Sequence, residues 1–265
     1  MQNLVNTLNG FIWSNALILL ALGAGLFFSI KTKFVQIRLF KEMIRLLMSG
    51  TSSKLGISPF QALSVSLSGR VGTGNIAGVA AAIGFGGPGA IFWMWVVAFF
   101  GASTAYIEST LGQIFKEESE GQYRGGPAYY IEKAMGAKWY ALFFAVATII
   151  ATGILLPGVQ ANSIGNAAEL ALGGGEIVDT VFGPLSSTKI TTSIFVLILL
   201  AFIIFGGVKR IASFTQVVVP FMALAYIVIS LSIIGLNINR LPEIITLTIN
   251  DAFTPMAGFG AAIGW

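Results

Sequence analysis

The stretch that decides the fold is "SGRVGTGNIAG", residues 68–78, which lies inside an otherwise apolar segment. It contains four glycines, one arginine and one asparagine within eleven residues. A glycine in a helix interior costs about 1 kcal/mol relative to alanine, so this composition predicts a break in the helix. Within hydrocarbon, irregular backbone persists only where it lines a protected cavity. The break therefore predicts a functional cavity at this point of the chain.

The composition around this stretch is that of a membrane protein. Of the 265 residues, 55% are hydrophobic and only 10% are charged, and the mean hydropathy is +0.85. A soluble domain carries about 25% charged residues. The chain has no histidine and no cysteine, so the commonest catalytic base and metal ligand, disulfides and thiolate chemistry are all absent. No paired acids lie within the apolar segments, so an intramembrane enzyme is not favoured.

Six apolar segments are long enough to be predicted membrane spans, since a span needs about 20 mostly apolar residues. They lie at about 11–30, 57–82, 88–114, 139–165, 190–206 and 212–236. No lysine or arginine precedes Lys31, so the first segment lacks the basic region of a signal peptide. The final "AGFGAAIGW" is interpreted as the start of another span.

Two segments between the spans are amphipathic rather than uniformly apolar. In "FVQIRLFKEMIRLLM", residues 34–48, the apolar residues recur at helical spacing and a basic stripe runs beside them. This pattern is typical of a helix that lies on the membrane surface. The segment "NINRLPEIITLTINDAF", residues 237–253, is too polar to span the bilayer, and we expect it to lie at the interface.

The positive charges predict the orientation of the chain. Twelve of the fifteen lysines and arginines fall in the first, third and fifth connections between spans, and two fall in the alternate connections. Because basic residues accumulate on the cytoplasmic side, the N-terminus is predicted to be outside the cell membrane (a bacterial-type inner membrane) and residues 31–56 inside. The net charge of +4 is then a topology signal. It does not indicate nucleic-acid binding, because no soluble basic domain is present to provide it.

The chemistry of a broken helix suggests what the cavity binds. One half-helix begins with N–H groups that favour a carboxylate, and the other ends with carbonyl groups that favour a cation. Transporters use discontinuous helices near the membrane midplane in this way. Alternatively, the glycines only permit close helix packing, since Gly74 and Gly78 have the spacing of a small-residue packing motif. Thr73 and Asn75 add polar side chains that packing does not require, which favours a binding site.

Four further stretches resemble one transporter family. "GGPGAIFWMWVVAFFGAS" at 86–103, "GTGNIAGVA" at 72–80, "GGPAYYIEKAMG" at 125–136 and "GVQANSIGNA" at 158–167 are similar to the alanine/glycine:cation symporters, the sodium:alanine symporter family. The likeness extends from about residue 5 to residue 265. The resemblance implies an all-α polytopic fold of the leucine-transporter type. In that fold two five-helix repeats are inverted about the membrane plane, and the first helix of each repeat is broken.

Mapped onto this chain, the resemblance implies a single transmembrane domain over 1–265. Residues 1–56 would form an extra N-terminal span and the cytoplasmic amphipathic helix. Residues 57–236 would form the first five-helix repeat. Residues 237–265 would form an external interfacial segment and the start of the second broken helix, with the second repeat missing.

The resemblance also implies a substrate site. The main-chain N–H groups of Thr73 and Gly74 would meet the substrate carboxylate, and Gln160 would contact the substrate. For Gln160 a plain helix–helix hydrogen bond is an alternative, since a buried amide needs a partner in any case.

A sodium site is implied beside it. Asn75 would offer a side-chain oxygen to Na⁺, and carbonyls near Ser68 and Val71 would face a second cation position. The expected function is sodium-coupled symport of a small neutral amino acid, alanine or glycine, into the cell. Na⁺ would be the coupling ion, with no other metal and no cofactor. The alternative is a non-transporting membrane remnant or assembly subunit that keeps the packing without a complete site.

Overall fold

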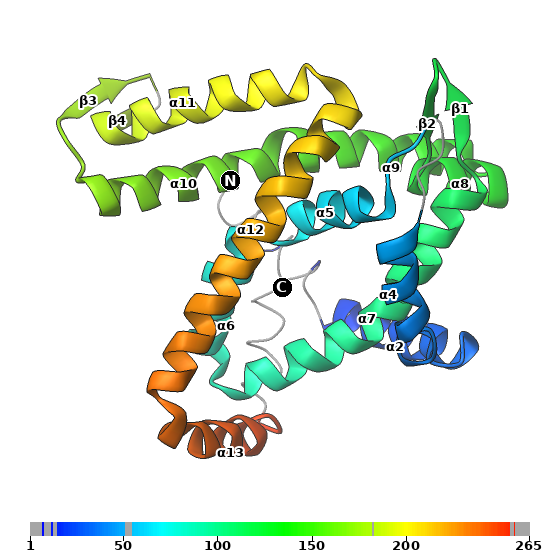
Figure 1. The fold of residues 1–265 in the computed structure, drawn as a ribbon, viewed down its shortest axis with the longest axis horizontal. Coiled ribbons are helices and arrows are strands. Elements are labelled where there is room, and N and C mark those ends of the chain that lie inside the picture. Colours follow the sequence, from blue (N-terminus) through cyan, green and yellow to red (C-terminus); the bar gives the residue numbers. More distant parts are fainter. Residues whose placement is uncertain are drawn as a thin grey trace. The chain divides into compact units, whose positions relative to one another are not determined.

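The computed structural model describes residues 7, 12, 15–50, 55–181, 183–254 and 257, and within them the chain is predominantly helical (Figure 1). Four helices are long and apolar enough to cross a membrane: Gly89–Ile114, Lys138–Leu172, Ser187–Ile204 and Gly207–Leu236. Two shorter apolar helices span Ala16–Lys31 and Gly74–Gly86. These helices confirm an all-α membrane protein. The expected starts of the first span and of the last one, with Lys54, lie outside the described residues.

The chain divides into two compact units, each built from segments that are distant in sequence. The first unit comprises Met1–Thr51, Gly74–Gly126 and Ala223–Trp265. Its elements are α2 (Asn15–Lys31), α3 (Val35–Arg38), α4 (Phe40–Ser49), η1 (Gly74–Gly78), α6 (Val79–Gly86), α7 (Gly89–Ile114), β1 (Glu117–Ser119), β2 (Gln122–Arg124), the part of α12 (Gly207–Leu236) from Ala223, η3 (Ile238–Arg240) and α13 (Leu241–Asp251).

Helix α2 packs along α7 through small residues. Ser29 and Ser103 are fully buried, and the Ser29 hydroxyl donates to the Ser103 hydroxyl at 3.0 Å. Ser103 Oγ also lies 2.9 Å from the Gly25 carbonyl oxygen. A Cβ on Gly25 would lie 2.9 Å from Cβ of Phe100. The two helices therefore approach as closely as a glycine allows, and hydroxyl hydrogen bonds satisfy the polar atoms between them.

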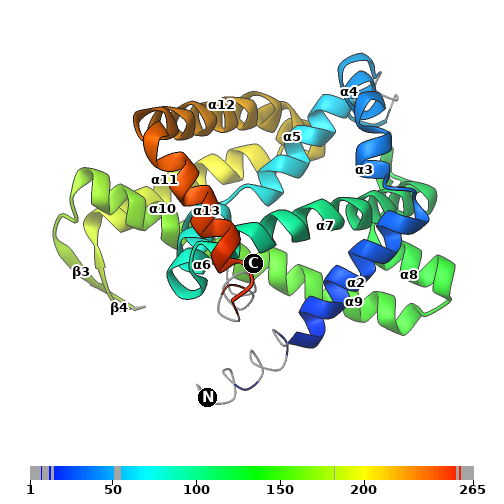
Figure 2. The ribbon, with the colours of Figure 1, turned by 90° about the horizontal axis from the view of Figure 1, so that it is seen from below.

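Helix α13 packs against α7 in the same unit (Figure 2). Ala90 near the start of α7 and Ala252 just after α13 are both buried. The sequence predicts that residues 237–253 do not span, and α13, at 11 residues, is not among the helices long enough to cross a membrane. Its alternation of apolar and polar residues suits a helix packed on one face only.

The second unit comprises Ser52–Thr73 and Pro127–Met222. Its elements are α5 (Pro59–Arg70), α8 (Pro127–Met135), α9 (Lys138–Ile150), η2 (Ala151–Leu155), α10 (Leu156–Leu172), β3 (Ile177–Thr180), β4 (Gly183–Ser186), α11 (Ser187–Ile204) and the part of α12 (Gly207–Leu236) up to Met222.

Helices α10 and α11 lie side by side, joined by the β3–β4 hairpin (Figure 1). Lys189 Nζ lies 3.3 Å from Glu169 Oε2. The aliphatic stem of Lys189 crosses Gly165, where a Cβ would lie 3.3 Å from its Cγ. Ser186 caps α11 by accepting a hydrogen bond from the Lys189 N–H. The first turn of α11 is thus fixed by a cap, an ion pair and a glycine contact.

Several element boundaries differ from those expected from hydropathy. The helix expected at 139–165 extends to Leu172, and the one expected at 212–236 begins at Gly207 and includes Lys209 and Arg210. A helix can continue beyond its apolar segment because its backbone hydrogen bonds do not depend on whether the side chains are apolar. The surface helix expected at 34–48 is interrupted at Leu39, and the polar turn after α7 and the loop at 173–186 contain short antiparallel hairpins.

Candidate functional site

The helix that begins at Pro59 breaks near the predicted position. Ser58 and Gln61 form a reciprocal capping box at its start, which fixes where α5 begins. The helix ends at Arg70, and Val71 has φ −101° and ψ 100°, an extended conformation. Helical structure resumes at Thr73 and continues as the π-helical segment η1. The break is therefore centred on Val71 and Gly72, within the predicted stretch of residues 68–78.

Gln160 reaches this break from helix α10, within the second unit. Its side-chain Oε1 accepts a hydrogen bond from the Thr73 backbone N–H at 3.3 Å and one from the Thr73 hydroxyl at 3.1 Å. Both residues are half-buried. The first N–H groups of a helix lack an acceptor inside the helix, and Gln160 supplies one for Thr73.

Gly72 provides the space for this contact. A Cβ at position 72 would lie 2.8 Å from Nε2 of Gln160 and 3.4 Å from its Cδ. Any side chain there would displace the Gln160 amide from Thr73. Sequence reasoning placed Gly72 in the break but did not predict this role, because a single sequence gives no signal for a contact between segments this far apart.

Gln160 lies just after an irregular turn of its own helix. The continuous helix Lys138–Leu172 contains the π-helical segment Ala151–Leu155, directly before Pro157. Proline has no N–H and clashes with the preceding turn, and a π-bulge is one way for a helix to accommodate this. Such bulges occur frequently at functional sites.

The other predicted residues lie on either side of the break. Ser68 is in the last turn of α5, and its hydroxyl donates back to the Val65 carbonyl at 2.7 Å, within its own helix. Val71 occupies the extended link. Gly74 and Asn75 begin η1, are exposed, and belong to the first unit. Thr73 and Gln160 are predicted site residues that the structure brings into direct contact.

This local arrangement is suited to an anionic acceptor. A helix N-terminus favours negative charge through its N–H groups and its dipole. A carboxylate accepts a stronger hydrogen bond from an N–H group than a neutral amide does. The Gln160 oxygen therefore occupies a position that a carboxylate oxygen would fill more favourably.

Comparison with known proteins identifies the family of the chain. The model of the sodium:alanine symporter family matches residues 1–265. YrbD of Bacillus subtilis, whose name describes a sodium/proton-dependent alanine carrier, is 53% identical over 264 residues, 100% of this chain and 52% of that protein. GlnT of the same organism, named as a sodium/glutamine symporter, is 40% identical over 266 residues, 100% of this chain and 53% of that protein.

A third relative is the sodium/proton-dependent alanine carrier protein of Bacillus sp. (strain PS3). It is 42% identical over 222 residues, 84% of this chain and 47% of that protein. The chain thus spans about half the length of the curated relatives it matches. A family match over all 265 residues, with apolar helices and a broken helix in place, establishes that the chain belongs to the sodium:alanine symporter family, a family of cation-coupled transporters.

Proposed function

We propose that the protein carries a small neutral amino acid, alanine or glycine, into the cell together with Na⁺. The observation that carries this proposal is the contact of Gln160 with the Thr73 N–H group at the helix break. This contact supports an acceptor site at the start of a half-helix, where the carboxylate of an amino acid would bind.

In this proposal the substrate takes over hydrogen bonds that the protein makes to itself. A substrate carboxylate would replace Gln160 Oε1 on the Thr73 N–H group and would also meet the N–H group of Gly74. The exchange is favourable because a charged acceptor makes the stronger bond. Gln160, once displaced from Thr73, would have its amide available for the substrate. The absence of a side chain at Gly72 leaves the Gln160 amide room beside the break.

Na⁺ is proposed to bind at two positions beside the break. The side-chain oxygen of Asn75 would ligate one ion, and the carbonyl oxygens near Ser68 and Val71 would face the second position; all are neutral oxygen ligands, which suit Na⁺. A proton would need a group that titrates, and residues 68–78 contain no acid and no histidine. Of sodium and the proton, the two coupling cations in the relatives' names, this favours Na⁺. Binding of cation and carboxylate close together would link the two affinities.

The proposal includes the architecture that the resemblance implies. The helices from α5 to α12 would belong to the first five-helix repeat of a leucine-transporter-type fold, with α2 as an additional N-terminal helix and α13 in the external interfacial segment. The N-terminus would be outside a cell membrane, as the distribution of basic residues suggests. The hydrogen bond between the start of α7 and the end of α13 requires these two segments to lie on the same side of the membrane, as the alternation of the proposed spans places them.

The test is uptake of labelled alanine and glycine into proteoliposomes that contain the complete protein. We expect uptake to require an inward Na⁺ gradient. Uptake that persists with choline in place of Na⁺ and without a pH gradient would contradict coupling to either ion. Uptake that persists with choline but requires an inward pH gradient would identify the proton as the coupling ion and contradict the sodium assignment. Uptake of labelled glutamine, suggested by the name of GlnT, is measured in the same way and tests the assignment of alanine or glycine as the substrate.

A further inference from the structure

Helix α4 has an apolar surface that the described part of the chain leaves uncovered. None of its ten residues, Phe40–Ser49, is buried. The exposed fractions of its apolar residues are high, 60% for Phe40, 49% for Ile44 and 79% for Met48. Exposed apolar surface of this kind on a regular helix indicates an interaction site.

The residues of α4 separate into two faces. At 3.6 residues per turn, Phe40, Met43, Ile44, Leu47 and Met48 fall on one side of the helix. Lys41, Glu42, Arg45 and Ser49 fall on the other, and Leu46 lies at the edge of that polar side. An apolar face opposite a charged face rich in lysine and arginine is the pattern of a helix that lies in the membrane interface.

The charges around α4 favour an anionic surface. Between Lys31 and Ser49 the chain has five basic residues and one acid, Glu42. The apolar helix α2 ends at Lys31, and only residues 32–39 separate it from α4. At roughly 3.5 Å per residue, α4 stays within about 32 Å of the end of α2. A bilayer surface is therefore within reach of this basic segment, and acidic headgroups complement its charge.

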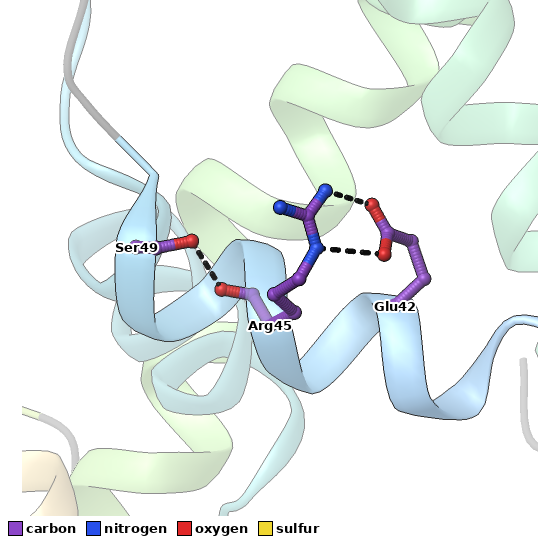
Figure 3. Close-up of polar contacts among 3 residues, drawn as sticks. All are labelled: Glu42, Arg45 and Ser49. Carbon is purple, nitrogen blue, oxygen red and sulfur yellow. Dashed lines mark hydrogen bonds and ion pairs between the residues drawn. The ribbon is translucent and has the colours of Figure 1, made fainter.

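The acid on the polar face is paired with one of the cations (Figure 3). Arg45 Nε donates to Glu42 Oε2 at 2.8 Å, and Arg45 Nη2 donates to Glu42 Oε1 at 2.5 Å. Both side chains remain exposed. The hydrogen bonds from Arg45 hold the pKa of Glu42 below its usual value, so Glu42 is ionised at neutral pH. A lipid phosphate offers the Arg45 guanidinium the same two-oxygen geometry as this carboxylate.

We propose that α4 docks on anionic phospholipid headgroups. Its apolar face lies below the headgroups, and Lys41 and Arg45 bind phosphate oxygens. Glu42 competes with lipid phosphate for Arg45 and so limits the strength of docking. The attachment of this segment to the membrane consequently depends on the fraction of anionic lipid and on ionic strength.

The experiment uses the absence of cysteine from the chain. A polarity-sensitive fluorophore is attached at Ile44→Cys on the apolar face or at Ser49→Cys on the polar face, in the protein embedded in nanodiscs. The lipid is phosphatidylcholine with an increasing fraction of phosphatidylglycerol. We expect the Ile44 probe to shift to an apolar environment as phosphatidylglycerol increases, and to shift back in high salt. The Ser49 probe should remain in a polar environment throughout.

Charge variants test the role of the ion pair. Each basic residue near an anionic surface should change the ratio of docked to detached helix about fivefold. Arg45→Gln and Lys41→Gln should lower this ratio, and Glu42→Gln should raise it. Lys138→Gln, which changes a basic residue at the start of α9, is the matched control and should have no effect.

Three results would overturn the proposal. A probe at Ile44 that is buried equally in phosphatidylcholine alone would show that headgroup charge is not recognised. A probe that stays solvated in every lipid would assign the surface to a protein partner. No response to Glu42→Gln would contradict the competition for Arg45.

Discussion

The carboxylate of Asp251 accepts a hydrogen bond from the backbone N–H of Gly89 at 3.0 Å, across 162 residues of sequence. Helix α7 begins at Gly89, and Pro88 at its N-cap position makes no side-chain hydrogen bond. Asp251, at the end of α13, therefore supplies the cap from a distant segment. The indole Nε1–H of Trp93 donates to the carbonyl of Ala252 at 2.5 Å beside it. The "GGPG" turn is thus the contact surface for the end of α13.

Removing this cap should destabilise the protein. We expect Asp251→Ala to lower the free energy of unfolding by about 1 kcal/mol, the usual cost of losing an N-cap acceptor. Thermal unfolding in detergent measures the effect. Glu243→Ala, which removes an exposed acid from the first turn of the same helix, is the control. Equal effects of the two changes would contradict the capping role.

The glycine that begins α7 should not tolerate a side chain. A Cβ on Gly89 would overlap the backbone of Asp251 and Ala252, whereas Gly101, in the same helix, has nothing within 4 Å of that position. Gly89→Ala should cost about 1–3 kcal/mol, as overpacking generally does. Gly101→Ala should be neutral or slightly stabilising, because alanine favours helix. The same unfolding measurement compares them, and equal stabilities would refute the close approach.

Gly72→Ala should act on substrate binding. Its Cβ would meet the flexible amide of Gln160, which can move, so we expect little loss of stability. The displaced amide would lose its place beside the break, where Gln160 is proposed to contact the substrate, so the apparent affinity for alanine should fall. Gly69→Ala is the control, since nothing lies within 4 Å of its Cβ position. Binding of labelled substrate at saturating Na⁺ distinguishes them. An unchanged affinity of Gly72→Ala for alanine would contradict a role of Gln160 in substrate binding.

Asn75→Ala should weaken Na⁺ binding. The change removes one proposed oxygen ligand, and substrate affinity at limiting Na⁺ should fall with it because the sites are linked. A coupling of about 1–3 kcal/mol corresponds to roughly 5–150-fold. Ser68→Ala keeps the main-chain carbonyl proposed to face the cation and should leave Na⁺ dependence intact. Substrate titrations at several Na⁺ concentrations test both variants. If Asn75→Ala keeps the Na⁺ dependence of the unmodified protein, Asn75 is not a Na⁺ ligand.

The predicted orientation can be read from two single cysteines. Val181 in the turn of the β3–β4 hairpin has 99% exposure, whereas Ser186 is buried as the cap of α11 and is a poor position for labelling. Glu118, on β1, is exposed on the side expected to be cytoplasmic. An impermeant thiol reagent on intact cells should label Val181→Cys and spare Glu118→Cys. The opposite labelling pattern would show that the predicted orientation in the membrane is reversed.

The sequence by itself predicted the features that depend on local composition. The apolar segments identified the membrane helices, and the glycines of residues 68–78 predicted the break, because glycine and hydrophobicity act through the residues nearest to them. The family likeness also came from short contiguous stretches. Helix ends were less predictable from hydropathy. Lys209 and Arg210 lie inside α12, because backbone hydrogen bonds extend the helix beyond its apolar segment.

The tertiary structure alone decided which distant residues meet. Nothing in the local sequence shows that Gln160 bonds to Thr73, that Gly72 makes room for this amide, or that Asp251 caps α7 at Gly89. Each contact depends on how two separate helices pack, and packing is set by the whole unit. The glycines of residues 68–78 marked where the chain departs from a plain helix, and the fold determined that the Gln160 side chain occupies the space at Gly72.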